Sequence, residues 1–582
     1  AGRTATLKLD PDAQTYTFGG TNNLIADISN ERIGIGGTPD SNTPLHIQDA
    51  TYGRVRIEST GANSFAILYL KNDAIEYAVR TNGSDAFEVR DDTAGAVRLS
   101  LDANSRISLS NNDSGTSNTI FGYQTANLIG AGDNYNVFIG HQVADADMTD
   151  ATQNVGIGYQ ALTSLTEADS NTAVGSGSLY NVTTGSFNVA MGHTAGDAIN
   201  TGSANTAIGT NALSATDDGV SNTAVGAYAM ELGNCGTSNT AVGAQSMIDV
   251  TGSYNTAVGM QSLFDITSGV SNVAIGALSL KFANAGESNN LAIGVEAMRD
   301  VKENGNTADS NIALGSLAMM GGTLSGDFIG NIAIGDRAMD ATNTNAQTGT
   351  IALGHHSLTA LTSGNGNISI GYTSSDALTT GQYNTVLGYN ALGAEVTRGT
   401  AVAIGWGALQ DQTHASDGAN SENVGIGFLA GAENVEGTGN TSVGFEALKG
   451  ASGQSNSNNT AIGKQALLSV TTGSNNTVMG RLTADALTSG NSNVVIGDSA
   501  LGTATTATLN VVIGGDSMSL VPASVAIQDV VAIGHNAFKG ASGTTTGANG
   551  AVAVGRDSLK AVTSAQRMTA IGFEALALED AG

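Results

Sequence analysis

The stretch Asn205-Thr206-Ala207-Ile208-Gly209-Thr210-Asn211-Ala212-Leu213 decides the fold, because its opening phrase returns throughout the C-terminal four-fifths of the chain. Aligned on the glycine, 26 copies run from Gly122 to Gly572, with a usual spacing of about 17 residues. A large apolar residue precedes the glycine in all 26, Asn stands four residues before it in 21, and Leu or Met stands four residues after it in 19. Structural roles are expected for the repeat residues, among them Gly122, Gly140, Gly175, Gly209, Gly226, Gly259, Asn171, Asn205, Asn222 and Asn255.

The repeat length selects the type of fold. A period of about 17 residues is too short for a helical hairpin repeat, which needs about 34, and a helix would not tolerate a glycine in every copy. Two short strands and two polar turns do fit into a repeat of this length. We therefore predict an all-β protein in which each copy forms one coil of a parallel β-solenoid.

Stacking of the coils turns each sequence position into a physical column, with equivalent residues about 4.8 Å apart. The Val/Ile column before the glycine and the Leu/Met column after it are each expected to form an apolar stripe. The Asn column can bond amide to carbonyl from coil to coil, and the glycine is expected to take a positive φ at a corner. The Asn ladder is expected to be interrupted where Ala401, Val530, Ala551 and Met568 replace Asn.

A coil this short encloses little volume, so a single thin solenoid would leave one apolar wall in water. Association of chains through that wall removes it from water. The repeat therefore favours an oligomeric rod, and 25 rises of about 4.8 Å between 26 coils give a shaft of roughly 120 Å.

The phrase Asn-Thr-Ala-Ile-Gly-x-x-Ala-Leu resembles the head repeats of trimeric autotransporter adhesins and the similar repeats of bacteriophage tail fibres. The resemblance covers about Asn118 to Leu576. It implies a left-handed parallel β-roll in which three chains pack around a threefold axis.

The residues before the repeats read as short alternating strands, at 54–57, 87–90 and 97–101, which predict a small antiparallel β-sandwich. Arg32-Ile33-Gly34-Ile35-Gly36 followed by Pro44-Leu45-His46-Ile47 resembles a linker of phage tail-fibre proteins, and the run from Phe87 to Leu99 is similar to their β-rich modules. We expect an N-terminal β segment and linker at 1–48, the antiparallel module at 49–113 and the β-roll shaft at 114–582.

Composition and charge limit the kinds of partner that the chain can bind. The net charge is −29, and such a surface repels phosphate backbones and anionic lipid, so we expect neither nucleic-acid binding nor membrane insertion. Cys235 is the single cysteine, which leaves no intrachain disulfide. The chain begins with Ala1, and we expect it to be a segment of a longer protein.

Residues that could carry chemistry are scattered. His141, His193, His355 and His535 each follow a repeat glycine, but in coils that are not neighbours, and the side chains of His355 and His356 are expected to point to opposite faces of a strand. We therefore predict no metal site, no cofactor and no catalysis. Two alternatives are weaker: a polysaccharide-cutting tailspike needs paired carboxylates in a groove, and an ice-binding solenoid needs an unbroken threonine array.

One ligand-binding alternative involves Trp406, the single tryptophan. It follows Gly405 in a column that points outward if the residue before the glycine points inward. The same coil is the longest and carries the insertion Asp411-Gln-Thr-His414-Ala-Ser-Asp417, so these side chains could contact a sugar. The competing interpretation, which we favour, is that Trp406 packs over Tyr389 of the neighbouring coil.

Together these features predict a non-catalytic trimeric virion tail fibre for host attachment. Its expected partners are two further copies of the chain, other tail or fibre proteins, and a host surface glycan or protein. The alternative is a trimeric adhesin on a bacterial cell surface.

Overall fold

A computed structural model describes residues 15–18, 24–27, 32–35, 45–47, 66–71, 76–81, 87–101, 107–109, 117–283, 286–302, 306–341, 346–413, 420–540, 548–561, 563 and 566–577. The chain divides into two compact units, Ala1–Asn112 and Asp113–Gly582. Each unit is built from strands and turns, and the described residues contain no helix.

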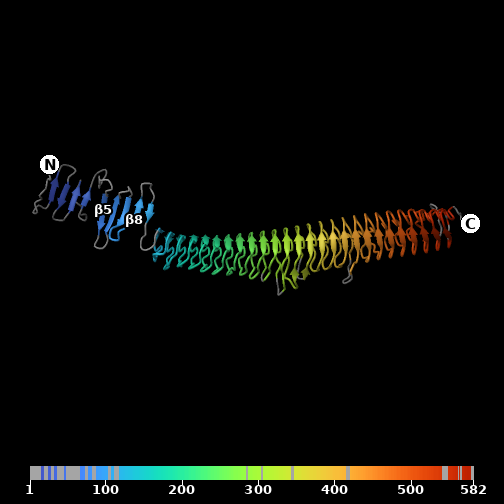
Figure 1. Ribbon diagram of the computed structural model, residues 1–582, viewed down its shortest axis with the longest axis horizontal. Coiled ribbons are helices and arrows are strands. Elements are labelled where there is room, and N and C mark those ends of the chain that lie inside the picture. The colour runs from blue at the N-terminus through green and yellow to red at the C-terminus, as the bar shows by residue number, and fades with distance from the viewer. Residues whose placement is uncertain are drawn as a thin grey trace. The chain divides into compact units, whose positions relative to one another are not determined.

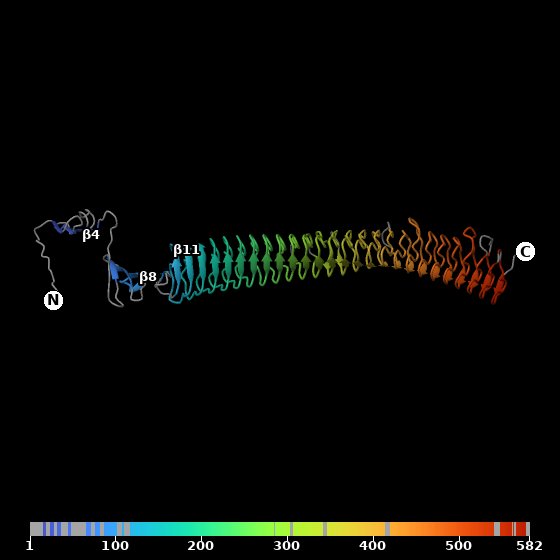
Figure 2. The same ribbon diagram turned by 90° about the horizontal axis from the view of Figure 1, so that it is seen from above.

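The second unit is a parallel β-solenoid, as predicted, and we refer to it as the shaft. Its strands stack side by side in chain order along the unit (Figures 1 and 2). They form one 26-stranded parallel sheet in which each strand pairs with the strand of the next coil. The strands of this sheet are β10 (Thr119–Phe121), β11 (Val137–His141), β12 (Val155–Tyr159), β13 (Thr172–Val174), β14 (Val189–Met191), β15 (Thr206–Ile208), β16 (Thr223–Val225), β17 (Thr240–Val242), β18 (Thr256–Val258), β19 (Val273–Ile275), β20 (Leu291–Ile293), β21 (Ile312–Leu314), β23 (Ile332–Ile334), β25 (Ile351–Leu353), β26 (Ile368–Ile370), β27 (Thr385–Leu387), β28 (Val402–Ile404), β29 (Val424–Ile426), β30 (Thr441–Val443), β31 (Thr460–Ile462), β32 (Thr477–Met479), β33 (Val494–Ile496), β34 (Val511–Ile513), β35 (Val531–Ile533), β36 (Val552–Val554) and β37 (Thr569–Ile571).

The second residue of each strand of this sheet faces the core, and this residue is usually the small Ala of the repeat. Ala207 and Ala224 are fully buried and pair in register across β15 and β16. The Val or Ile before the glycine faces outward, so that Val258 and Ile275 are 36% and 38% exposed. In none of the described coils is the residue in this position buried. We call this column the outer apolar stripe.

The core is completed by the column four residues after the glycine. Leu213, Met230 and Leu263 are fully buried there. Every member of this column has a φ between +46° and +63°, in the left-handed region. Val, Ile and Thr are absent from the column, because a β-branched side chain is strained in that conformation. The preference for Leu and Met therefore reflects backbone conformation as well as burial.

The Asn ladder is present in the form predicted. In the buried column, Asn205 donates its backbone N–H and its side-chain amide to Asn188 Oδ1, at 3.0 and 3.1 Å. The same amide also donates to the carbonyl of Gly219 at 2.7 Å. Each Asn therefore binds the neighbouring coil and closes the return turn of its own coil, which satisfies polar groups that burial would leave unpaired.

Where Asn is replaced, the strand ladder continues. The backbone N–H of Ala401 still donates to Asn384 Oδ1 at 2.9 Å, and β28 pairs with both neighbouring strands. The amide that Ala401 lacks is replaced by a buried chain in which Asn423 donates to Gln412 and Gln412 donates to Glu395, at 2.8 and 3.0 Å. Loss of the Asn therefore interrupts the side-chain ladder without interrupting the sheet.

The repeat glycine forms a corner of each coil, directly after the residue of the outer apolar stripe. Gly259 has a φ of +134°, and a Cβ at this position would lie 2.6 Å from both the carbonyl carbon and the oxygen of Gly276. Glycine is therefore required both by the backbone conformation and by the close approach of the next coil. The remaining strands of the shaft, β22 (Phe328–Ile329) and β24 (Gln347–Thr348), form a separate parallel pair.

The first unit contains two sheets. One has four strands in the order β1 (Thr15–Phe18), β2 (Leu24–Asp27), β3 (Arg32–Ile35) and β4 (Leu45–Ile47). The other is an antiparallel meander of β5 (Ala66–Lys71), β6 (Glu76–Thr81), β7 (Phe87–Asp91), β8 (Ala96–Leu101) and β9 (Ile107–Leu109). Strands were predicted at 87–90 and 97–101 and are confirmed, while the strand predicted at 54–57 lies outside the described residues.

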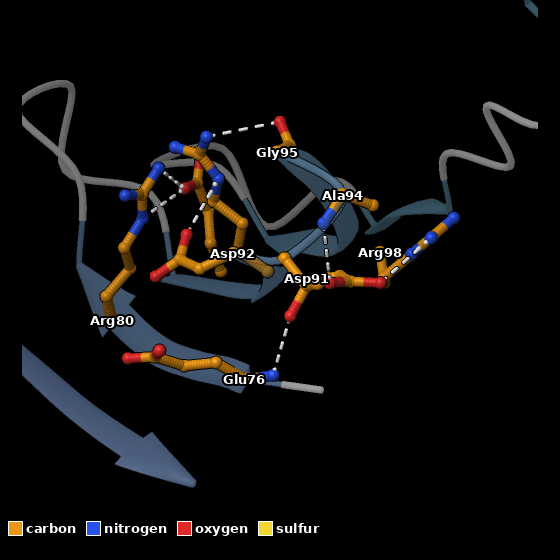
Figure 3. A network of polar contacts seen from close by, with 10 residues as sticks. Glu76, Arg80, Asp91, Asp92, Ala94, Gly95 and Arg98 are labelled. Carbon is orange, nitrogen blue, oxygen red and sulfur yellow. Dashed lines mark hydrogen bonds and ion pairs between the residues drawn. The ribbon is translucent and has the colours of Figure 1, made fainter. Parts of the chain in front are cut away.

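Ion pairs hold the turn between β7 and β8 in the meander (Figure 3). Asp91 accepts hydrogen bonds from the backbone N–H of Ala94 at 3.0 Å and from Arg98 at 3.1 Å. These bonds, the Ala94 bond foremost, lower the pKa of Asp91. Arg90 pairs with Asp92 at 3.0 Å and donates to the carbonyl of Gly95 at 3.1 Å. These contacts stabilise the turn, so the charged cluster has a structural role.

Candidate functional site

The most distinctive surface of the shaft is a stack of five aromatic rings, which we call the aromatic ladder. Its rings belong to successive coils, and each residue follows its repeat glycine. The rings of Tyr372, Tyr389, Trp406, Phe428 and Phe445 lie nearly parallel, with consecutive centroids 5.2, 6.1, 4.9 and 5.1 Å apart. All five are between 40% and 49% exposed. The ladder is therefore a ribbon of ring edges on the outside of the shaft.

The backbone explains this spacing. Gly407 donates its N–H to the carbonyl of Tyr389 at 3.0 Å, and Asn390 donates to that of Tyr372 at the same distance. These bonds carry the parallel ladder past the glycine corner, so the ring-bearing residues repeat at the coil spacing. That spacing falls within the centroid range of stacked aromatic pairs, which contribute about 0.5–1.5 kcal/mol each beyond their buried area.

Charged and polar residues occupy both ends of the same column. His355 stacks on Tyr372 at 5.1 Å with an interplanar angle of 5°. At the other end, Lys464 Nζ lies 5.6 Å from the centroid of the Phe445 ring. In the two following coils Arg481 pairs with Asp498 at 2.7 Å.

The structure confirms that Trp406 packs on Tyr389, and it also places Phe428 against the opposite face of the indole. With both faces covered, Trp406 offers a ligand only its exposed edge. Burial, and secondarily Glu433, raise the pKa of Asp411. The other two residues of the sugar-contact alternative, His414 and Asp417, lie outside the described residues.

A shallow pocket lies on the turns that precede this part of the ladder. It has a volume of about 290 Å³, near the lower end for ligand pockets, and its lining includes Tyr383, Arg398, Thr400 and Asn420. The lining is mostly polar, which suits a hydrated ligand better than an apolar one.

The expectation that His355 and His356 point to opposite faces of a strand is wrong. Strand β25 ends at Leu353, and the two histidines follow the Gly354 corner in a turn where His356 has a φ of +56°. The alternation of an extended strand does not apply there, and the two ring centroids lie 4.2 Å apart. Asp336 of the preceding coil lies 3.4 Å from His355, between Oδ2 and Nε2.

The other candidate residues lie apart from this cluster. His141 is flanked by Tyr123 and Tyr159, with centroids 5.3 and 5.4 Å away. Cys235 is buried, and its burial raises the pKa of the thiol to about 11, so that it is a poor nucleophile at neutral pH. The repeat glycines and asparagines serve the sheet and the core.

Sequence reasoning missed the aromatic ladder as a unit, although the signal was available. Reading the residue after each glycine coil by coil gives Asp336, His355, Tyr372, Tyr389, Trp406, Phe428, Phe445, Lys464, Arg481 and Asp498. When only the histidines of this column are compared, the carboxylate of Asp336, which lies in the same column one coil before His355, is not recognised as a neighbour.

Comparison of the chain with protein-family models, with curated proteins and with solved structures gave no match. Among the described residues there is no long apolar helix of the kind that crosses a bilayer.

Proposed function

We propose that this chain forms a rigid trimeric shaft of a virion attachment fibre, which spaces or displays a host-binding surface and performs no catalysis. The repeat phrase, which resembles that of tail fibres, supports the assignment to a virion. The outer apolar stripe is the single observation that supports assembly into a trimer. The stripe runs along a sheet of 26 strands without a buried member. A monomer would keep this apolar face in water along the whole rod.

The size of the face supports association. A sheet of 26 strands at about 4.8 Å, with three residues of about 3.3 Å per strand, presents on the order of 1,200 Å². In a trimer this face is shared between two neighbours, so each pairwise interface covers about 1,200 Å² counted over both chains, which is the lower limit of the range of about 1,200–2,000 Å² for stable interfaces. Exposed apolar side chains lie along this face, with Ile157, Met191, Val258, Ile334, Leu387 and Met479 each between 36% and 49% exposed.

Parallel in-register association suits such a face. Because every coil repeats the same outward residues, a threefold arrangement brings equivalent Val and Ile side chains together at each level. The acidic charge of the chain, −29, then remains on the surfaces that face water, where it keeps a long rod soluble and discourages contact with nucleic acid.

Host recognition in this proposal falls to a tip or to neighbouring tail proteins, with a glycan or a protein as the surface receptor. The aromatic ladder is the part of the shaft best suited to a direct contact. Because each ring of the ladder packs on the next ring, the main contribution of the ladder is to the stiffness of the shaft.

A matched pair of substitutions tests the trimer. Val258→Lys places a charge on the outer apolar stripe, whereas Val270→Lys places it on a return turn with nearly the same exposure, 39% against 36%. Sedimentation of the full chain should show that the first substitution dissociates the trimer at lower temperature or higher dilution and that the second leaves it intact. Equal behaviour of both variants would contradict association through this face.

The two settings, virion and bacterial surface, need a different experiment. An antibody to the shaft should decorate fibres on isolated particles in immunogold electron microscopy. Labelling of the envelope of the producing cell would favour the adhesin instead. A tailspike that degrades polysaccharide would be supported by the release of oligosaccharides from host capsule or lipopolysaccharide by the purified chain.

A further inference from the structure

Asp336, His355 and His356 form a cluster of potential metal ligands on two successive coils. One ligand atom from each of the three side chains lies within 4.8 Å of the other two. The Nε2 atom of His355 and the Oδ2 atom of Asp336 are 3.4 Å apart, and both side chains are 44% exposed.

The backbone and the aromatic ladder hold these residues in place. The N–H of His356 donates to the carbonyl of Asp336 at 3.1 Å, and the N–H of Thr373 donates to the carbonyl of His355 at 3.0 Å. The His355 ring is stacked on Tyr372. A metal bond to imidazole lies in the ring plane, so this face-on stacking fixes the ring while leaving its nitrogens accessible.

We propose that Asp336, His355 and His356 bind one divalent transition-metal ion of the zinc class per chain, which joins two successive coils. In a tetrahedral site with bonds of about 2.0–2.1 Å, neighbouring ligand atoms lie about 3.4 Å apart, which matches the Asp336–His355 separation. The third ligand is a ring nitrogen of the half-buried His356, which lies within 4.8 Å of the other two ligand atoms. The fourth position is left to water.

The ligand chemistry selects the ion. Two imidazoles with one carboxylate suit Zn²⁺, Ni²⁺, Co²⁺ and Cu²⁺, whereas Ca²⁺ and Mg²⁺ prefer all-oxygen sites. The surrounding charges are mixed. Asp340 and Asp376 both lie within electrostatic range of His356. The guanidinium of Arg337 lies 3.9 Å from the carboxylate of Asp340. The negative charge of Asp340 beside the site is therefore partly compensated.

The chain offers substitutions that remove a ligand and keep the fold. His355→Phe retains a ring on Tyr372 and extends the aromatic ladder. His356→Gln introduces a residue that already occupies the equivalent position of other coils. The examples are Gln142, Gln160 and Gln261, each with a φ of +53° to +55°. His141→Phe is the control, because it changes a histidine of the same column whose neighbours in that column are tyrosines.

Isothermal titration calorimetry of the full, untagged chain with ZnCl₂ provides the test, with MgCl₂ and CaCl₂ titrated in parallel. We expect saturable binding of one Zn²⁺ per chain, weakened at least tenfold in His355→Phe and in His356→Gln and unchanged in His141→Phe. We also expect Zn²⁺ to raise the melting temperature of the wild type and not that of the two ligand variants. Equal Zn²⁺ affinity of the wild type and both ligand variants, or no saturable binding by the folded wild type, would overturn the proposal.

Discussion

Asn459 Oδ1 accepts two hydrogen bonds from Asn476 of the next coil, one from its backbone N–H and one from its side-chain amide, each 3.0 Å long. The same amide of Asn476 also donates to the carbonyl of Gly490 at 2.9 Å. One side chain therefore links two neighbouring coils and closes a turn. Repetition of this arrangement explains why a rod with so little enclosed volume has a defined register.

Asn476→Asp should destabilise the shaft by about 1–3 kcal/mol, because the carboxylate cannot donate: the buried carbonyl of Gly490 loses its partner, and Asn459 Oδ1 keeps only the bond from the backbone N–H. Asn475→Asp is the matched control, since Asn475 is the exposed neighbour with a φ of +60° that Asp also adopts readily. Chemical denaturation of the two variants measures the difference. Equal midpoints would show that the ladder contributes no stability.

Gly259→Ala should be more destabilising than Gly453→Ala. Both glycines have positive φ, +134° and +76°, but an added methyl group meets the backbone of Gly276 in the first case and nothing within 4 Å in the second. The overlap should add about 1–3 kcal/mol to the conformational strain. Thermal unfolding followed by circular dichroism compares the variants, and a larger effect at Gly453 would refute the assignment of the corner.

Leu263→Ile should cost about 1–3 kcal/mol, whereas Leu263→Met should cost less than about 1.5 kcal/mol. The side chain is fully buried and its residue has a φ of +47°, so the β-branched isomer is strained although its volume is unchanged. Met occupies the same column at Met230 and Met247. A higher denaturation midpoint for Leu263→Ile than for Leu263→Met would show that packing, rather than backbone conformation, determines which residues occupy this column.

Asp485→Asn should reduce the pH dependence of shaft stability. Burial raises the pKa of Asp485, so the folded state binds its proton more tightly than the unfolded state does. This carboxyl therefore destabilises the fold at neutral pH, and its penalty is relieved as the pH falls through its raised pKa toward the ordinary value of 3.8. The unfolding free energy of Asp485→Asn should exceed that of the wild type at pH 7.5, and the difference should shrink as the pH is lowered to 3.8. A difference that grows on acidification would contradict the direction of the shift.

The repeat made much of the fold predictable, because the spacing of Gly, Asn and Leu/Met constrains the backbone in every coil. The outward direction of Val258 and Ile275 was harder to predict, since either face of an alternating strand could have been the inner one. Alternation also fails at the glycine corner, where positive φ places residues on both sides of the glycine on the outer surface.

The same corner explains the error at His355 and His356, which lie in a turn and share one side of the coil. The Glu395–Gln412–Asn423 network has no counterpart in the repeat, so no column could have indicated it. Of the candidate sugar contact, only Trp406 and Asp411 lie in the described part of the chain. The stacking of Trp406 on Tyr389 could be predicted because both residues occupy one column in adjacent coils.

The native mass of the full, untagged chain, measured by light scattering after size-exclusion chromatography, tests the proposed trimer most directly. A chain of 58.2 kDa whose outer apolar stripe is buried between three copies should give three times that mass, in a particle that elutes early because its shaft is elongated. A stable, soluble particle with the mass of a single chain would contradict the account.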